Sequence, residues 1–296
     1  MIFVGHTLQS NSGPLVSIVM PSYNHGQYIG QAVRSVIEQK YQNWELIIVD
    51  NNSNDDTDQV LATMSDQRIN IIKINNHGVI AKSRNAGIDA SNGSFIAFLD
   101  SDDWWHPNKL EKQVAFMLAR PELGISGTRL LTYPAGRKIP FPLRATRTIT
   151  LGRLLKENVF YNSSIVITRE AMQAVGRLSE IADNRGVEDY AFWLGILSNG
   201  YCGVLLKDVL GYYRIHSSQV SSLDGVFVNF CKVARVIAEY SGTPGFFRAF
   251  RSQFNLCEIQ YLSGKYQKFS FRLFFEPVRI LNKIRTLLRA VVLHLK

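Results

Sequence analysis

The first hundred residues alternate short apolar runs with stretches whose apolar residues recur at helical spacing. Val16 to Met20 is the first run, and from Tyr28 to Glu38 the apolar side chains fall on one side of a helix. Further runs follow at Leu46 to Val49, Ile69 to Ile74 and Phe95 to Leu99, with helical stretches between them at Asp55 to Met64 and Ala81 to Ala90. Strands that alternate with helices predict an α/β protein built on a mostly parallel sheet.

Polar residues follow three of these predicted strands at the point where each strand ends. They are PSYN from Pro21, DNNS from Asp50 and DSDD from Asp100. The carboxyl ends of parallel strands share one edge of the sheet, and ligands of such sheets bind beyond that edge. We therefore expect a binding site there.

The segment FLDSDDWW, from Phe98 to Trp105, places Asp100, Asp102 and Asp103 directly after a buried strand. Clustered carboxylates at a strand end would have raised pKa values unless a positive partner neutralises them. Asp100 and Asp102, one residue apart, could offer oxygens to one Mg²⁺ or Mn²⁺ ion, which also takes waters and phosphate oxygens as ligands. A divalent cation would supply the missing charge, although an isolated D-x-D pattern also occurs in loops and helix caps.

Three other kinds of phosphate site do not fit the sequence. The turn after the first strand, from Asn24 to Gly30, lacks the G-x-G-x-x-G spacing of dinucleotide-binding folds, and the chain contains no P-loop. A dehalogenase-type phosphatase requires Thr or Val after its acidic strand end, where this chain has Asp103 and Trp104.

An ordered set of segments resembles the family 2 glycosyltransferases, which have the GT-A fold. The segments are VSIVMPSYNHGQYIGQAVRSVIEQ, WELIIVDNNSNDDT, NHGVIAKSRNAGIDASNGSFIAFLDSDD, GVEDYAFWLGI and YYRIHSSQVS, and they span roughly Val16 to Ser221. The resemblance implies a catalytic domain over 14–221 that uses a nucleoside-diphosphate sugar, most plausibly a UDP-sugar, and inverts the anomeric centre.

The resemblance also implies roles for individual residues. Asp102 would be the direct metal ligand, and Asp100 would contact the ribose or the metal. The other donor contacts would come from Pro21 and Tyr23 in the nucleotide pocket, Asp50 and Asn51 at the base and ribose, and Arg84 at the base or pyrophosphate. Family members usually carry a second acid where this chain has Asn51. Because an asparagine both donates and accepts hydrogen bonds, the identity of the donor's nucleotide base is less well defined than the fold.

Two further segments would complete the site. The general base would be an acid of Glu188-Asp189, with Asp189 preferred, taking the proton of an acceptor hydroxyl. His216 would lie near the metal or the diphosphate. Without the family pattern, both acids could simply favour the N-terminus of a helix at Tyr190, His216 could be structural, and Trp104 and Trp105 could pack in the core as readily as shape an acceptor pocket.

The net charge of +9 is concentrated near the C-terminus. Glu276 is the only acid there among eight cations, Lys265, Lys268, Arg272, Arg279, Lys283, Arg285, Arg289 and Lys296. Interleaved with apolar residues, these cations predict that 222–296 forms basic amphipathic helices on an anionic membrane surface. The alternative is a helical appendage that packs on the catalytic domain or on a second subunit. Nucleic acid fits less well, because no binding module accompanies the charge.

The remaining features favour a cytoplasmic enzyme, peripheral on the inner face of the membrane. The N-terminus lacks the pattern of a secretory signal, no apolar run reaches the roughly 18 residues of a membrane span, and the three cysteines have no metal-site spacing. We expect transfer to a glycan or lipid-linked acceptor in bacterial surface polysaccharide assembly. The alternatives are a non-catalytic nucleotide-sugar binder, against which Glu188-Asp189 argues, and a nucleotidylyltransferase, whose Gly-rich N-terminal loop is missing.

Overall fold

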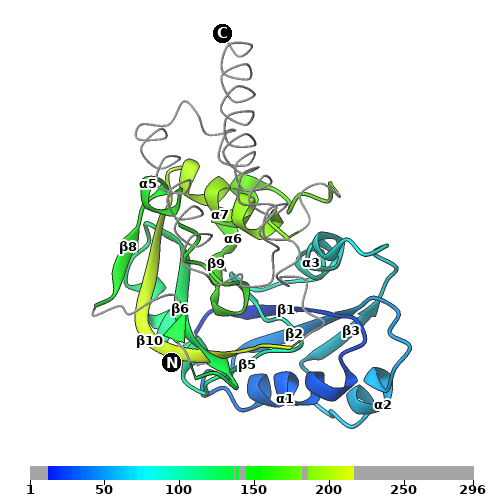
Figure 1. Cartoon of the computed structure of the whole chain (residues 1–296). Coiled ribbons are helices and arrows are strands. Elements are labelled where there is room, and N and C mark those ends of the chain that lie inside the picture. Colours follow the sequence, from blue (N-terminus) through cyan, green and yellow to red (C-terminus); the bar gives the residue numbers. More distant parts are fainter. Residues whose placement is uncertain (1–12, 137, 140–144, 156, 182–185, 217–296) are drawn as a thin grey trace, which may run out of the picture. The chain divides into compact units, whose positions relative to one another are not determined.

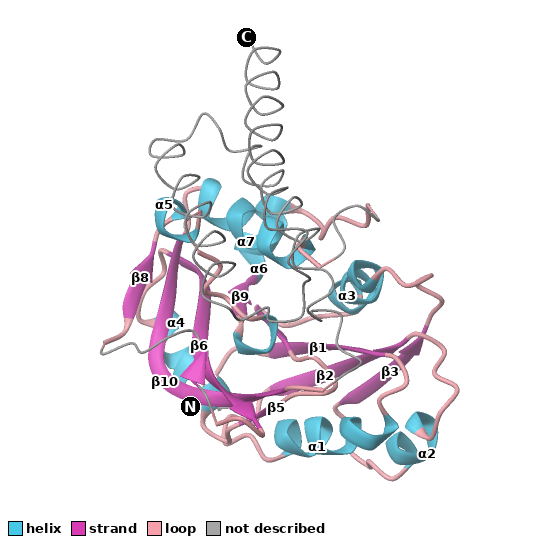
Figure 2. Ribbon diagram, in the orientation of Figure 1, coloured by secondary structure: helices cyan, strands magenta, loops and turns pink. Residues whose placement is uncertain are grey.

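The computed structural model describes residues 13–216, apart from 137, 140–144, 156 and 182–185. The predicted basic helical region, 222–296, lies outside the described residues, so its structure stays a prediction. The described part contains a ten-stranded sheet with helices on both of its faces (Figures 1 and 2).

Four parallel strands form the first half of this sheet, in the spatial order β3-β2-β1-β4. They are β1 (Val16–Ser22), β2 (Trp44–Asp50), β3 (Ile69–Lys73) and β4 (Phe95–Phe98), and the helices between them are α1 (Gly26–Ile37), α2 (Thr57–Ala62) and α3 (Ile80–Asp89). The predicted strands and helices of this half are confirmed, with small shifts at their ends. Strand β1 continues past the predicted stop because Pro21 and Ser22 pair in register with Val49 and Asp50.

The alternation of side chains along β1 divides the core into two layers. Ile18 and Met20 pack with the apolar side of α1, whereas Val19 points to the opposite layer, which contains residues of α3. Figure 1 shows α1 and α2 on one face of the sheet and α3 on the other. Each helix therefore covers the face that its own apolar stripe can bury.

The second half of the sheet is mixed, and the sequence predicted none of its strands. Strand β9 (Val166–Thr168) lies antiparallel between β4 and β6 (Leu123–Tyr133), and β10 (Cys202–Arg214) runs parallel to β6. The short strands β5 (Trp104–Trp105), β7 (Lys138–Ile139) and β8 (Arg147–Ile149) are antiparallel additions. The sheet is thus parallel only in its first half, β1 to β4, and within the β6–β10 pair.

Helices of the second half cover this sheet as well. They are α4 (Lys109–Leu118), α5 (Leu151–Leu154), the 3-10 turn η1 (Asn162–Ser164), α6 (Arg169–Val175) and α7 (Glu188–Ser198). Residues of α6 and α7 share a hydrophobic core with α3, and Trp193 of α7 is fully buried beside Phe98 of β4, with 5.7 Å between the ring centroids. This packing brings the start of α7 toward the end of β4.

A glycine allows α3 to approach β1 closely. A Cβ on Gly87 would overlap Cγ1 of Val19, so only a hydrogen fits at this point of the interface. Arg84 lies one turn earlier on α3 and is itself buried. The buried side chain of Arg84 thus starts from a helix turn next to this close contact with β1.

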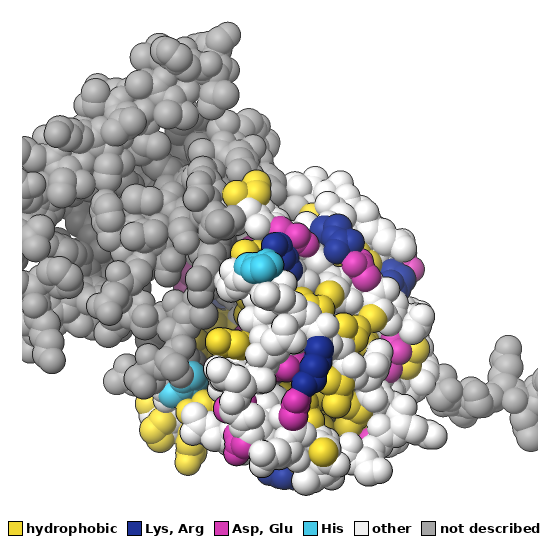
Figure 3. All heavy atoms as spheres, turned by 90° about the vertical axis from the view of Figure 1, so that its right-hand side faces the viewer, with side chains coloured by type: hydrophobic (Ala, Val, Ile, Leu, Met, Phe, Trp, Pro, Cys, Tyr) yellow, Lys and Arg dark blue, Asp and Glu magenta, His cyan; other side chains and the backbone are white. Residues whose placement is uncertain are grey.

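The surface of the described region carries charges of both signs side by side. On the face at the right-hand side of Figure 1, which includes α2 and β3, Lys and Arg side chains lie next to Asp and Glu (Figure 3). Ion pairs join Lys73 to Asp58 and Arg68 to Asp66. Among the described helices, none combines the length and the apolar character needed to cross a bilayer.

Candidate active site

The predicted cluster of polar residues at the carboxyl edge of the sheet is present in the structure. Ser22 at the end of β1 pairs in register with Asp50 at the end of β2, and the acidic loop, residues 99–103, begins where β4 ends. The acidic loop is tied down by its backbone, since the amide of Leu99 donates to the carbonyl of Val19 (3.1 Å) and that of Asp103 to the carbonyl of Asp100 (3.0 Å).

Hydrogen bonds from protein groups contact all three carboxylates of the acidic loop, so the carboxylates do not depend on a cation alone. Oδ1 of Asp100 accepts hydrogen bonds from Arg84 (3.1 Å) and from Asn162 of η1 (2.9 Å). Oδ2 of Asp102 lies 2.8 Å from Nε2 of His216. Arg84 thus supplies part of the positive charge that the acidic sequence requires, and His216 gives Asp102 a polar partner.

Asp103 differs from its two neighbours because it is fully buried. Its oxygens accept hydrogen bonds from the Ser163 hydroxyl (2.6 Å) and the Arg214 amide (2.8 Å). Burial, reinforced by the charges of Asp102 and Asp100, raises the pKa of Asp103 well above its usual range. Asp103 therefore anchors the acidic loop to η1 and β10.

Arg84 connects the acidic loop to α7. Its side chain is only 6% exposed, and its guanidinium donates to Glu188 (2.9 Å) as well as to Asp100. Two carboxylates on one buried guanidinium offset the cost of removing its charge from water. Arg84 was predicted to approach the base or pyrophosphate, and the structure places it between the two acidic segments of the site.

Glu188 and Asp189 form the first turn of α7, and their environments differ. Glu188 is buried against Arg84, while Asp189 is only partly buried, and its Oδ1 accepts a hydrogen bond from the Tyr190 amide (2.6 Å). Burial, together with the charge of Glu188, raises the pKa of Asp189 to about 7 against the opposing effect of Arg84. A carboxylate that titrates near neutral pH is suited to accept a proton, as predicted for Asp189.

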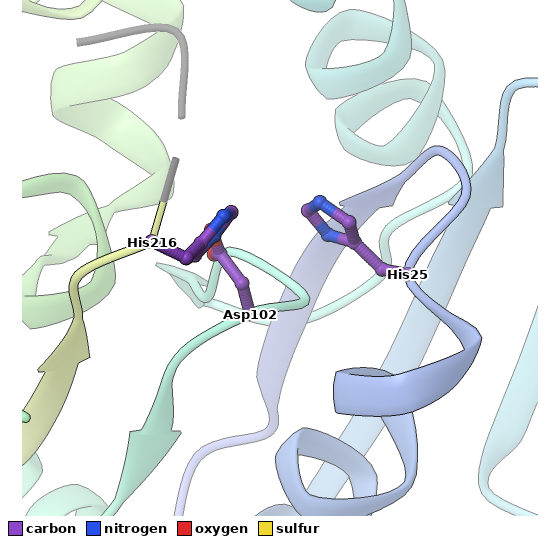
Figure 4. Close-up of side chains that lie close together, drawn as sticks. All are labelled: His25, Asp102 and His216. Carbon is purple, nitrogen blue, oxygen red and sulfur yellow. The ribbon is translucent and has the colours of Figure 1, made fainter. Parts of the chain in front are cut away.

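Three side chains form a group that could hold a metal ion. Ligand atoms of His25, Asp102 and His216 all lie within 4.8 Å of one another, and the side chains converge from separate parts of the chain (Figure 4). The sequence singled out Asp102 and His216 but not His25, although His25 directly follows the polar residues at the end of β1. Asp100, the other predicted metal contact, is not in this group, and its Oδ1 is engaged by Arg84 and Asn162.

These donors fit a divalent cation. Burial lowers the pKa of His25, although the charges of Asp102 and Asp100 partly offset this effect, so the ring favours the neutral form that binds metals. Imidazole nitrogens and a carboxylate oxygen are common ligands of first-row transition metals. Together they leave further coordination positions for phosphate oxygens or water.

The residues predicted to hold the nucleotide lie around the ends of β1 and β2. Tyr23 is 53% exposed, and Pro21 lies within β1. Asp50 is buried, and its Oδ2 accepts a hydrogen bond from the Ser53 amide (3.0 Å), while Oδ1 of Asn51 accepts one from the Asn76 amide (2.7 Å). The structure therefore shows Asp50 and Asn51 shaping the loops of this edge.

Two tryptophans after the acidic loop have different surroundings. Trp105 is buried, and its Nε1 donates to the carbonyl of Ser163 (2.6 Å), so it belongs to the core. Trp104 is partly exposed and stacks on Tyr212 of β10, with 4.8 Å between ring centroids and 9° between ring planes. A role in shaping the acceptor pocket therefore stays a prediction for Trp104.

Comparison with known proteins identifies the family. The model of glycosyl transferase family 2 matches residues 17–178, which is more than half of the chain. The chain belongs to this family. Its relatives include the "Putative teichuronic acid biosynthesis glycosyltransferase TuaG" of Bacillus subtilis (strain 168), which is 32% identical over 216 residues, 72% of this chain and 84% of the relative.

A second relative of this family 2 chain has a more detailed name. It is the UDP-Glc:alpha-D-GlcNAc-diphosphoundecaprenol beta-1,3-glucosyltransferase WfgD of Escherichia coli, 34% identical over 209 residues, 70% of this chain and 80% of the relative. Among solved structures, S. aureus TarS 1-349 in complex with UDP-GlcNAc superposes with a TM-score of 0.69 at 18% identity, covering 87% of this chain and 76% of that one. The protein is a family 2 glycosyltransferase with the GT-A fold.

Proposed function

We propose that this enzyme transfers a sugar, with inversion, from a nucleoside-diphosphate sugar to a hydroxyl of a glycan or lipid-linked acceptor. A UDP-sugar is favoured as the donor, because WfgD is named for UDP-Glc and for a diphosphoundecaprenol-linked acceptor. Bacterial surface polysaccharide assembly is the proposed setting, since the name of TuaG places it in teichuronic acid biosynthesis.

The observation that carries the proposal is the position of Arg84 between Asp100 and Glu188. It joins the segment that contains Asp102 to the helix turn that contains Asp189. Asp102, which is suited to hold a cation at the diphosphate, and Asp189, which is suited to accept a proton, therefore belong to one site. A protein that only binds nucleotide sugars would not need the second group.

In the proposed mechanism, Asp189 accepts the proton of the acceptor hydroxyl as its oxygen bonds to the anomeric carbon of the donor. The bond from that carbon to the diphosphate oxygen breaks, and its electron pair leaves with the nucleoside diphosphate. Attack from the face opposite the leaving group inverts the anomeric centre. Pro21, Tyr23, Asp50 and Asn51 are proposed to line the nucleotide pocket.

Asp102 and His216 are proposed to hold a divalent cation, Mn²⁺ or Mg²⁺, with Asp100 close to the ribose. The cation, when bound, neutralises charge that grows on the departing diphosphate. Arg84 keeps Asp100 and Glu188 in place, so we assign it a positioning role. Its buried guanidinium already donates to both carboxylates.

Calorimetric titration with UDP, GDP and dTDP, each with and without Mn²⁺, tests the donor assignment. We expect metal-dependent binding of UDP that is at least tenfold tighter than that of the other two nucleotides. Equal binding of all three would contradict the donor preference. Absence of any nucleotide binding, with or without metal, would contradict the transferase proposal itself.

We also propose that 222–296 binds the anionic inner face of the membrane and places the catalytic domain, 14–221, beside a lipid-linked acceptor. The support is the sequence: eight cations and one acid lie among the apolar residues of its last part. Binding of the full chain to anionic vesicles tests this, as set out below.

A further inference from the structure

We propose that His25 is a third protein ligand, so that the metal site has two imidazoles and one carboxylate and selects Mn²⁺ or a later first-row metal over Mg²⁺. This inference builds on the proposed metal-binding role of Asp102 and His216. It adds a ligand that the sequence motifs do not contain and a metal preference that follows from the ligand types.

The first argument is the convergence of the three side chains. Ligand atoms of His25, Asp102 and His216 lie within 4.8 Å of one another, although they come from the loop before α1, the acidic loop and the residues after β10 (Figure 4). The two imidazole rings are 6.0 Å apart and nearly perpendicular, at 86°. Bonds of roughly 2.0–2.2 Å from one ion require ligand atoms about 3–4 Å apart, so a small inward movement would complete the site.

The second argument is the hydrogen bond that orients His25. Nδ1 of His25 lies 2.8 Å from Oγ of Ser101, which is buried. Metal-bound histidines usually engage their other ring nitrogen with a neighbouring group, and this contact fixes the ring and its tautomer. When Nδ1 donates to Ser101, Nε2 keeps its lone pair for a metal. Ser101 directly precedes Asp102, so one residue positions both ligands.

The third argument is the rigidity of the surroundings of His25. Its carbonyl accepts hydrogen bonds from the amides of Tyr28 and Ile29 (both 2.8 Å), so its main chain is fixed at the start of α1. The Tyr28 ring lies 5.7 Å from the ring of His25 and 5.0 Å from that of His216. Both imidazoles therefore pack against the ring of Tyr28.

The metal preference follows from the kinds of atom in the group. Mg²⁺ favours all-oxygen coordination, whereas imidazole nitrogens bind transition metals more strongly. Asp100 could have added an oxygen ligand, but it is not in this group of side chains, and its Oδ1 accepts hydrogen bonds from Arg84 and Asn162. The protein thus offers nitrogen for two of its three positions, and a donor diphosphate could supply oxygens for the rest.

Electron paramagnetic resonance of Mn²⁺ added to the purified full chain, with UDP present, tests the inference. We expect Mn²⁺ to bind at least tenfold more tightly than Mg²⁺ in competition, with nitrogen couplings from two imidazoles in the pulsed spectrum. His25→Gln should weaken Mn²⁺ binding by at least about tenfold, since even the loss of an outer-shell partner typically costs about 10- to 100-fold, and should leave the coupling of one imidazole. His77→Asn, at an exposed histidine whose φ of 52° asparagine tolerates, is the control and should change neither result.

The outcomes separate this inference from the proposed function. Unchanged Mn²⁺ affinity and nitrogen coupling in a folded His25→Gln variant, together with loss of both in His216→Gln, would overturn the role of His25 alone. Equal affinity for Mg²⁺ and Mn²⁺ in the wild-type chain would overturn the metal preference. Absence of Mn²⁺ binding by the wild-type chain would overturn the inference and the proposed metal site together.

Discussion

Arg84 of α3 and Glu188 of α7 form a buried ion pair, with 2.9 Å between Nη1 and Oε1, across the two halves of the sequence. The side chains are only 6% and 5% exposed. The second guanidinium nitrogen of Arg84 reaches Asp100 in the acidic loop. The pair therefore joins the first half of the sheet, through α3 and the acidic loop, to the helix that carries the proposed base.

Replacing Arg84 with Met should destabilise the protein strongly. The change leaves Glu188 buried without its cation, and breaking a buried ion pair costs roughly 3–5 kcal/mol. Urea unfolding measures the difference. Arg177→Met, at an exposed pair with Asp89, is the control and should cost about 1 kcal/mol or less. Equal losses in the two variants would show that the Arg84 pair contributes no more than a surface pair.

Asp189→Asn should lower the rate of transfer strongly while sparing donor binding. Loss of a general base lowers turnover by about 10²- to 10⁴-fold, whereas calorimetric affinity for the metal-bound donor should stay within about twofold. Wild-type turnover should rise with pH and level off above the pKa of Asp189, about 7, because only the ionised carboxylate accepts a proton. Full transfer by Asp189→Asn would contradict this assignment.

The same raised pKa predicts how stability depends on pH. Asp189 binds its proton more tightly in the folded state than in the unfolded chain, so its contribution to the free energy of unfolding falls as pH rises from about 4 to 7. Asp189→Asn should therefore gain in melting temperature relative to wild type at pH 8. The gain should shrink toward pH 4, and a difference that is constant with pH would argue against a raised pKa.

Asp102→Asn should remove metal-dependent donor binding. The amide carries no charge and binds divalent cations poorly, so we expect the effect of Mn²⁺ on UDP affinity to fall by at least tenfold. Calorimetry with and without EDTA measures it. Asp208→Asn, which changes an acid paired with Lys112 on the surface, is the control. The same response to metal in wild type and Asp102→Asn would contradict the assignment.

Gly87→Ala should destabilise the fold through a single methyl group. The new carbon would overlap Val19, and overpacking of this kind typically costs about 1–3 kcal/mol. Gly152→Ala, in a helix where the added carbon meets nothing within 4 Å, should be neutral or stabilising. In a Val19→Ala background the cost of Gly87→Ala should fall, and an unchanged cost would mean that another contact is responsible.

Neutralising three cations of the C-terminal region should weaken binding of the full chain to anionic vesicles. With Lys283, Arg285 and Arg289 replaced by Gln, a loss of about 1 kcal/mol per charge predicts a reduction of about 100-fold in sedimentation assays at moderate salt. Replacing three cations of the catalytic domain, Lys73, Arg153 and Arg177, is the matched control. Equal vesicle binding by the two triple variants would contradict the membrane proposal.

The first half of the fold could be predicted from the sequence because each buried strand is a short apolar run followed by a polar turn. The second half could not. Strand β6, Leu123–Tyr133, carries glycines and polar residues that fit it to its close neighbours, and β9 has only three residues. Their pairing depends on segments far along the chain, which no local pattern reports.

Some residues of the site were predicted from the sequence, and others were not. The acidic loop, Asp189 and His216 stand in recognisable segments, and the structure places all of them near the carboxyl edge of the sheet. His25 was missed because its proposed role as a metal ligand depends on Asp102 and His216, which lie close to it in space but far along the sequence. Asn162 and Ser163 donate hydrogen bonds to the acidic loop, but they lie in a segment where the sequence showed no motif.

The anchoring of the acidic loop has a consequence for how fast its amides exchange with solvent. Besides the amides of Leu99 and Asp103, the amide of Asp100 is bonded, to the hydroxyl of Ser163 (3.1 Å), and just after the loop the amide of Trp105 donates to the hydroxyl of Ser35 (3.0 Å). Loops usually exchange their amide hydrogens quickly, but here we expect deuterium uptake as slow as that of the neighbouring strands. A donor that binds at this edge therefore meets an ordered surface, and the heat capacity change on binding should be too small to include folding of a segment.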